Sequence, residues 1–186
     1  MEESLFERLK SSMPTNQVLC KSVIARKLQG RNSEFIKQNF SKILDEIHEE
    51  IYDEYKSKEK ALTQPLLDEL VREGGRVDFD ELNAFFLSLS QSRKGRAGFA
   101  FEYMIEELLM QLKYPFDTQV IVDGAKPDFV LPSEEFFRKR PLDSLILTAK
   151  RTLRERWRQV VTEANKAYAL YLVTLDEKIS ANQLAE

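Results

Sequence analysis

The stretch A-K-P-D-F-V-L, residues 125–131, is followed by a second apolar run, L-I-L-T-A-K, residues 145–150. Short apolar runs bounded by polar and turn-forming residues are typical of buried strands. Asp128 lies near the end of the first run, and Lys150 ends the second, 22 residues later. If the two runs are neighbouring strands, a carboxylate and an amine come together at one edge of a sheet.

The second half of the chain predicts an α/β core. Helical spacing of apolar residues over 99–112 gives way to strand patterns, and helical spacing returns over 152–166. A loop with a short helical turn is expected over 132–142, and a further helix from Ile179 onward. The expected strands cover residues 119–122, 128–131, 144–149 and 168–175.

The first half predicts helices. Two short amphipathic helices are expected over 3–12 and 17–29, and one long helix over 33–60 whose end, residues 53–60, is polar all round and therefore solvated. A further helix opens at Gln64-Pro65 and closes at Gly74-Gly75, and Asp78 is placed to cap the next.

The basic stretch 91–98, Q-S-R-K-G-R-A-G, is expected to form a joint between two helices. We therefore expect one domain over 1–186, made of a helical elaboration over 1–90 and an α/β core over 91–186.

Composition excludes several classes of protein. Hydrophobic residues make up 42% of the chain, which argues against disorder, and no apolar run is long enough to cross a bilayer. The first residues lack the apolar segment of a secretory signal. Cys20 is the only cysteine, which excludes an internal disulfide and a zinc site built of several cysteines. We expect a globular protein of the cytosol.

Positive charge is concentrated in one segment. The net charge is −3, yet residues 138–158 hold eight Lys or Arg against Asp143 and Glu155, a local charge of +6. Such a concentration is typical of a surface that binds phosphates. The alternative is a solvated, charged helix.

The aspartate, the lysine and the basic segment together favour metal-dependent cleavage of DNA. A divalent cation lowers the pKa of a bound water and neutralises charge on the phosphate, and Mg²⁺ prefers carboxylate oxygens. A nearby lysine stabilises the developing negative charge. In the widespread nuclease pattern P-D…(D/E)-x-K a second carboxylate precedes the lysine by two residues. Here that position is Thr148, which is not a charged ligand.

The order P-D-F, T-A-K, R-E-R-W-R-Q-V and Glu163 resembles the EcoRII-type restriction endonucleases, with relatives such as PspGI and SsoII. In that family the missing carboxylate stands on the following helix, 13 residues after the lysine, which is Glu163 in this chain. The resemblance covers roughly Arg93 to Leu175, whereas the first 90 residues are not matched. It implies a restriction-endonuclease-like fold, with a mixed sheet flanked by helices.

The resemblance also implies roles for single residues. Asp128 and Glu163 would bind Mg²⁺, Lys150 would act at the scissile phosphate, and Glu102 would be an acidic residue on a helix near the metal, with Glu106 and Glu107 as competitors. The alternative for Glu102 and for Glu163 is an ordinary carboxylate on the surface of a helix.

Two further groups of residues are expected to contact DNA. Arginine pairs with guanine and glutamate with cytosine in the major groove, so a helix that begins with an R-E-R triplet can read adjacent C·G pairs. The alternatives are a row of surface salt bridges for this triplet and a solvated turn for the basic joint. The base-reading residues are Arg154, Glu155 and Arg156, and the residues expected at backbone phosphates are Lys94, Arg96 and Arg151.

These features predict a type II restriction endonuclease of the prokaryotic cytosol. It would cut double-stranded DNA at a short palindrome with CC/GG half-sites, leave 5′ overhangs, and act as a homodimer. A DNA-binding module without turnover and a sequence-tolerant repair nuclease are the alternatives. Members of the family push a base out of the duplex onto an aromatic ring, and the sequence does not select among Phe35, Phe40, Tyr52 and Tyr55.

Overall fold

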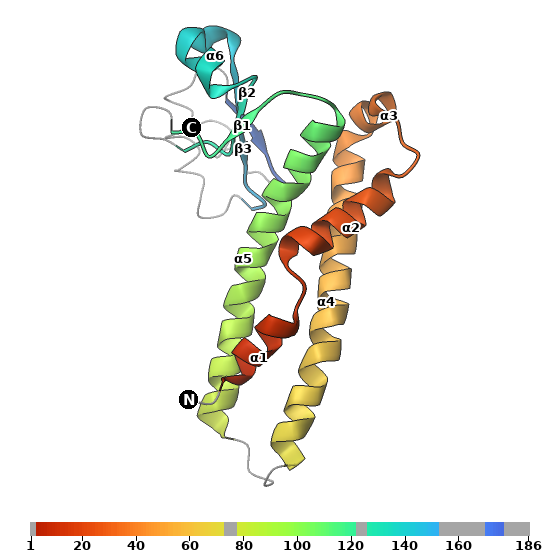
Figure 1. Ribbon diagram of the computed structural model, residues 1–186, viewed down its shortest axis with the longest axis vertical. Helices are drawn as coiled ribbons and strands as arrows, with labels where there is room; N and C mark the ends of the chain where they lie inside the picture. Colours follow the sequence, from red (N-terminus) through yellow and green to blue (C-terminus); the bar gives the residue numbers. More distant parts are fainter. Residues whose placement is uncertain (1–2, 73–77, 122–125, 153–169, 177–186) are drawn as a thin grey trace. The chain divides into compact units, whose positions relative to one another are not determined.

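The computed structural model describes residues 3–72, 78–121, 126–152 and 170–176 (Figure 1). The chain forms two compact units. The helical unit comprises residues 1–30 and 42–100, and the sheet unit comprises residues 31–41 and 101–186. Among the described residues, none of the helices combines the length and the apolar character needed to cross a membrane.

The helical unit contains α1 (Leu5–Ser12), α2 (Asn16–Leu28), most of α4 (Phe40–Arg72) and the first two thirds of α5 (Phe79–Gln111). Hydroxyl side chains begin the two short helices, because Ser4 Oγ accepts from the Glu7 amide and Thr15 Oγ1 from the Val18 amide. The predicted helices 3–12 and 17–29 are thus confirmed. The core of this unit is built of aliphatic side chains that include Leu9, Val23, Ile43 and Ile47.

Helix α4 corrects three predictions. The expected helix 33–60 is divided at Asn39 into α3 (Ser33–Gln38) and α4, and α4 then continues past Pro65 to Arg72. A proline removes one helical hydrogen bond, but the rest of the ladder persists, and Gln64 Nε2 donates to Asp68 Oδ1 across it at 2.9 Å. The expected solvated end is also wrong, since Tyr55 and Glu59 are buried.

Helix α5 shows that the predicted joint over 91–98 is wrong. The helix begins where expected, because Asp78 Oδ1 accepts from the amides of Asp80 and Glu81, but it runs unbroken to Gln111. The two glycines cost helix stability without ending the helix. In Figure 1, α4 and the part of α5 in the helical unit run side by side in opposite directions.

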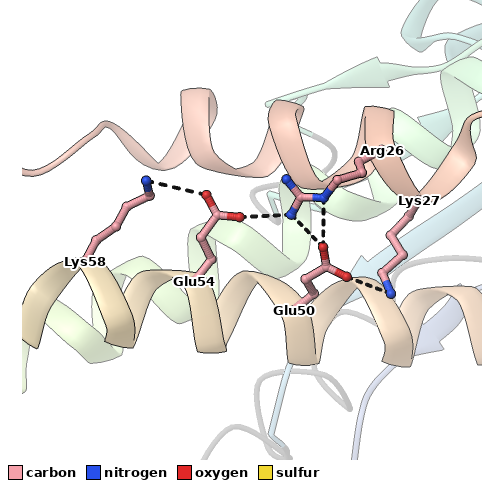
Figure 2. Close-up of polar contacts among 5 residues, drawn as sticks. All are labelled: Arg26, Lys27, Glu50, Glu54 and Lys58. Atoms are coloured by element: carbon pink, nitrogen blue, oxygen red, sulfur yellow. Dashed lines mark hydrogen bonds and ion pairs between the residues drawn. The ribbon is translucent and has the colours of Figure 1, made fainter.

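Helix α2 is held on α4 by a chain of alternating charges (Figure 2). Arg26 lies between Glu50 and Glu54, with N···O distances of 2.5 and 3.0 Å, and Lys27 contacts Glu50 at 2.6 Å. Lys58 extends the chain by pairing with Glu54. Hydrogen bonds from Lys27 and Arg26 lower the pKa of Glu50 below its usual value. The network fixes the register of α2 along α4.

The sheet unit contains a mixed four-stranded sheet in the order β1-β2-β3-β4. Strands β1 and β2 are antiparallel, β2 and β3 are antiparallel, and β3 and β4 are parallel. The strands are β1 (Asp117–Thr118), β2 (Phe129–Leu131), β3 (Leu145–Ala149) and β4 (Leu170–Val173). Three of the four predicted strands are confirmed. The first is wrong, because it lies at 117–118 and Gln119, with φ of 60°, leaves the extended conformation.

Besides α3 and the last third of α5, the described part of the sheet unit contains two helical segments between β2 and β3. Helix α6 (Glu134–Lys139) and a 3-10 turn (Pro141–Asp143) confirm the short helical turn expected over 132–142. A core of Val120, Val130, Phe137 and Ile146 joins α6 to the sheet, with Leu170 packed against it. The helices expected over 152–166 and from Ile179 lie outside the described residues.

Candidate active site

Asp128 and Lys150 meet at one edge of the sheet, as the sequence predicts. Asp128 immediately precedes β2, Lys150 immediately follows β3, and the antiparallel register of the strands brings these two ends together. Lys150 Nζ donates to Asp128 Oδ2 at 2.9 Å. The Ala149 amide donates to the same oxygen at 2.7 Å. The carboxylate is therefore fixed by β3 through both a side chain and the backbone.

Lys150 is also held from its other side. Its amide donates to the Val173 carbonyl at 2.9 Å, which continues the parallel pairing of β3 with β4. The residue is only 8% exposed. Because a buried ammonium is costly without a counter-charge, the Asp128 carboxylate compensates for the burial of Lys150. Partial burial also strengthens the attraction between the two charges.

Thr148 occupies the position of the missing carboxylate. It is completely buried, and the strand register places it opposite Asp128. Within the described ranges there is no cluster of three or more His, Cys, Asp or Glu residues suited to a metal ion. The acid predicted to complete the site, Glu163, lies outside the described residues, as do Arg154, Glu155 and Arg156.

Glu102 lies in the sheet unit, on α5, beside the fully buried Phe101. Its position near the metal stays a prediction. One of its two competitors is engaged locally, because the Tyr103 hydroxyl donates to Glu107 Oε1 at 2.6 Å.

The residues expected at backbone phosphates have different surroundings. Since α5 is continuous, no helix begins after Lys94 and Arg96, and the predicted contact through a helix N-terminus is wrong. Arg96 Nη1 donates to the Pro14 carbonyl and to Asn16 Oδ1, both at 3.1 Å. Lys94 is exposed, and Arg151 is half-buried beside Lys150. The phosphate contacts of all three remain predictions.

A cavity of about 50 Å³ lies within the helical unit, between α2, α4 and α5. Tyr52, 53% exposed, and the buried Tyr55 line it, together with Arg93, Arg96 and His48. The Arg96 guanidinium lies over the Tyr55 ring, 5.2 Å from its centre. The sequence left four aromatic residues open as stacking platforms and gave His48 no role, because a cavity formed by three helices has no local sequence signal.

A buried ion pair supports one wall of this cavity. Glu59, only 3% exposed, accepts two hydrogen bonds from Arg93 Nε, at 2.9 and 3.1 Å, and is also paired with its Nη2. Burial opposes the ionisation of Glu59, but hydrogen bonds from Arg93 and Tyr55 outweigh it and lower the pKa. Burial and the adjacent Glu59 carboxylate raise the pKa of Tyr55 to about 12.

Comparisons with known proteins identify the family and the fold of the chain. Residues 55–186 match the family model described as EcoRII C terminal. The chain is 38% identical over 125 residues to the type II restriction enzyme EcoRII of Escherichia coli, covering 63% of this chain and 30% of that protein. It is 29% identical over 175 residues to the type II restriction enzyme SsoII of Shigella sonnei, covering 81% and 57%. The chain thus spans less than two thirds of either relative.

Solved structures show the same fold. Metal-depleted Ecl18kI in complex with uncleaved DNA superposes with a TM-score of 0.81 at 27% identity, over 97% of this chain and 68% of that one. The PspGI complex with substrate DNA gives a TM-score of 0.77 at 23% identity, over 99% and 76%. The predicted restriction-endonuclease-like fold is therefore confirmed. Because the family model matches well over half of the chain and includes both Asp128 and Lys150, the chain belongs to the EcoRII C-terminal family.

Proposed function

We propose that the chain is a Mg²⁺-dependent type II restriction endonuclease of the prokaryotic cytosol. The observation that carries the proposal is the ion pair of Asp128 and Lys150, held at 2.9 Å at the joined ends of β2 and β3. Membership of the EcoRII C-terminal family supports the reaction type. A carboxylate and an ammonium at one sheet edge are the groups that metal-assisted phosphodiester hydrolysis needs.

The Asp128 carboxylate is suited to a hard cation. Both hydrogen bonds that the described residues donate to it end on Oδ2, which leaves Oδ1 for a metal. Asp128 and Glu163 would hold Mg²⁺, which when bound lowers the pKa of a water and neutralises charge on the phosphate. A structure of the similar Ecl18kI is described as metal-depleted, which supports a divalent ion. Lys150 directs its ammonium at the developing negative charge.

Sequence recognition is assigned to Arg154, Glu155 and Arg156, which would read C·G pairs in CC/GG half-sites. A palindromic site calls for a homodimer in which each subunit reads one half. The Ecl18kI and PspGI structures are DNA complexes, which supports double-stranded DNA as the partner. Cleavage would fall 5′ of the first cytosine and leave 5′ overhangs.

Cleavage of a randomised duplex library tests this proposal. With Mg²⁺ we expect ends that share one CC/GG palindrome and carry 5′ overhangs, and with EDTA we expect intact DNA. Ends without a common sequence would favour the sequence-tolerant nuclease instead. Retarded but uncut DNA in electrophoresis with Mg²⁺ would favour the binding module.

The cavity in the helical unit is proposed to receive a base pushed out of the duplex. Tyr52 provides an exposed ring at its edge, and Arg93 and Arg96 bring positive charge to its wall. Stacking of a base on an aromatic ring contributes about 1–3 kcal/mol.

We expect Tyr52→Ala to raise the fluorescence of 2-aminopurine at the centre of the bound site above the wild-type level, because stacking on an aromatic ring quenches the fluorescence of this base. Phe79→Ala is the matched control, since Phe79 is an exposed ring that does not line the cavity. Fluorescence at the wild-type level in Tyr52→Ala would show that the base goes elsewhere.

A further inference from the structure

Helix α5 ends in a backbone conformation that normally selects glycine, yet the residue there is Lys113. Its φ is 59°, in the left-handed region. The Tyr114 amide donates to the Leu109 carbonyl and the Lys113 amide to the Met110 carbonyl, both at 3.0 Å, which is the hydrogen-bond pattern of a Schellman cap. A side chain at this position is strained, because its Cβ crowds the backbone. Backbone strain of this kind clusters at functional sites.

Lys113 belongs to a basic, aromatic surface of the sheet unit. Lys37 Nζ lies 5.7 Å from the centre of the Tyr114 ring, which places α3 beside the end of α5. The Arg31 guanidinium lies 5.3 Å from the centre of the Phe35 ring. We call these five residues the α3–Lys113 patch.

The charges of the patch are accessible. Phe35 and Tyr114 are 44% and 43% exposed, and both lysines are exposed. Within the ranges that the structure describes, neither Lys37 nor Lys113 forms an ion pair with a carboxylate. The carboxylate on α3, Glu34, accepts a hydrogen bond from Gln38 at 2.9 Å.

We propose that the α3–Lys113 patch binds backbone phosphates of the duplex outside the recognition sequence. The inference rests on the proposed function, because it takes DNA as the partner. Exposed ammonium groups without carboxylate partners complement phosphate oxygens, and the rings of Phe35 and Tyr114 hold neighbouring cations in place. A lysine kept at a strained helix end, on a chain of net charge −3, agrees with a demand for local positive charge.

The fold limits where these phosphates lie. Thr118 pairs with Phe129, the residue that follows Asp128. Thr118 lies five positions after Lys113 in the chain, a reach of at most about 18 Å. The patch therefore serves phosphates within about one helical turn, roughly 34 Å, of the bond at Asp128.

Lys113→Gly distinguishes the two effects of Lys113, which are strain in the backbone and positive charge at the surface. We expect Tm to rise by about 2–4 °C, because glycine relieves the strain. At the same time, binding of a 30-base-pair duplex with the site at its centre, measured without Mg²⁺, should weaken. The magnitude of the slope of the log binding constant against log salt concentration should fall by about 0.9 in Lys113→Gly, which corresponds to one phosphate contact. In the double variant Lys37→Gln/Lys113→Gly it should fall by about 1.8. The wild type and Lys113→Gly should bind equally well to a 12-base-pair duplex that lacks the flanking DNA.

Lys113→Arg, which keeps the charge, should bind the long duplex like the wild type, and Lys10→Ala, which removes a lysine from α1, should keep the wild-type slope. A Lys113→Gly protein with unchanged slope on the long duplex overturns the inference. So does a loss of binding that coincides with dissociation of a dimer in size-exclusion chromatography, because the patch would then contact protein. A wild type that binds no DNA at all would instead refute the proposed function.

Discussion

Lys150→Ala should reduce the rate of DNA cleavage by about a hundredfold to a thousandfold, while the protein still binds its site. Among the described residues, Lys150 provides the only cation that contacts Asp128, at 2.9 Å. The backbone amide of Lys150 is fixed to β4 by its hydrogen bond to the Val173 carbonyl. Removal of the ammonium leaves the carboxylate able to hold a cation but takes away the group that stabilises charge on the phosphate. Single-turnover cleavage of the site identified from the library, at saturating enzyme, measures the effect.

Two controls make this result specific to the chemistry. Lys10→Ala removes an exposed lysine that pairs with Glu7 on α1, and it should cleave at the wild-type rate. Asp128→Asn should abolish cleavage, and unlike Lys150→Ala it should also weaken the binding of Mn²⁺, used as a probe of the metal site and followed by calorimetry. Cleavage at the wild-type rate by Lys150→Ala would remove the observation on which the proposed reaction rests.

The pairing of Asp128 with Lys150 was predictable because patterns within a short stretch of sequence determine it. Two apolar runs with a short helical segment between them can form neighbouring strands, and each charged residue stands at a strand end. The hydrogen bond from the Ala149 amide to Asp128 was not predictable, since it depends on the register of β2 against β3. Thr148 offers no charged ligand, so the second acid, Glu163, stays a prediction that lies outside the described residues.

The errors in the first half arise where tertiary contacts override local preference. Two glycines within residues 91–98 weaken a helix by about 2 kcal/mol in total, which predicts a break. Between and beside them, Arg93 pairs with Glu59 and Arg96 bonds to Pro14 and Asn16. These contacts form only when α5 is a continuous helix, and they join residues 34 to 82 positions apart, beyond the range of any sequence pattern.

The polar end predicted for the helix 33–60 shows the same limitation. Residues 53–60 contain mostly charged side chains, so the pattern indicates a solvated surface. Glu59 is buried there because Arg93 neutralises its charge. Arg93 lies 34 residues further along the chain, so this pairing produces no periodic pattern in the sequence. Lys113 is a similar case, since a lysine gives no sign of a left-handed helix cap.

Among changes to the ion pairs that the structure describes in the helical unit, Arg93→Ala should have the largest effect on stability. It leaves Glu59, 3% exposed, as a buried carboxylate without its main counter-charge. Breaking a buried ion pair costs about 3–5 kcal/mol, and the lower value of about 3 applies because the Arg93 side chain is 41% exposed. For a chain of this size the loss corresponds to a fall in Tm of roughly 6–12 °C, measured by calorimetry at pH 7.

The pH dependence identifies the unpaired charge as the cause. In the wild type the pKa of Glu59 is lowered, so the carboxylate stabilises the fold at neutral pH, and this stabilisation disappears as the pH falls through the folded-state pKa. Without Arg93, burial raises the pKa of Glu59, so the difference in stability between variant and wild type should begin to shrink as the pH falls through this raised pKa. It should be smallest below the lowered pKa of Glu59 in the wild type.

The double variant Glu59→Gln/Arg93→Ala provides the control, because it removes the charge as well as its partner. It should be more stable at neutral pH than Arg93→Ala alone, since an uncharged amide is less costly to bury than a carboxylate. A loss of stability in Arg93→Ala that is independent of pH and is not relieved by Glu59→Gln would mean that Arg93 acts through packing. Its alkyl stem, not the charge of Glu59, would then hold α4 and α5 together.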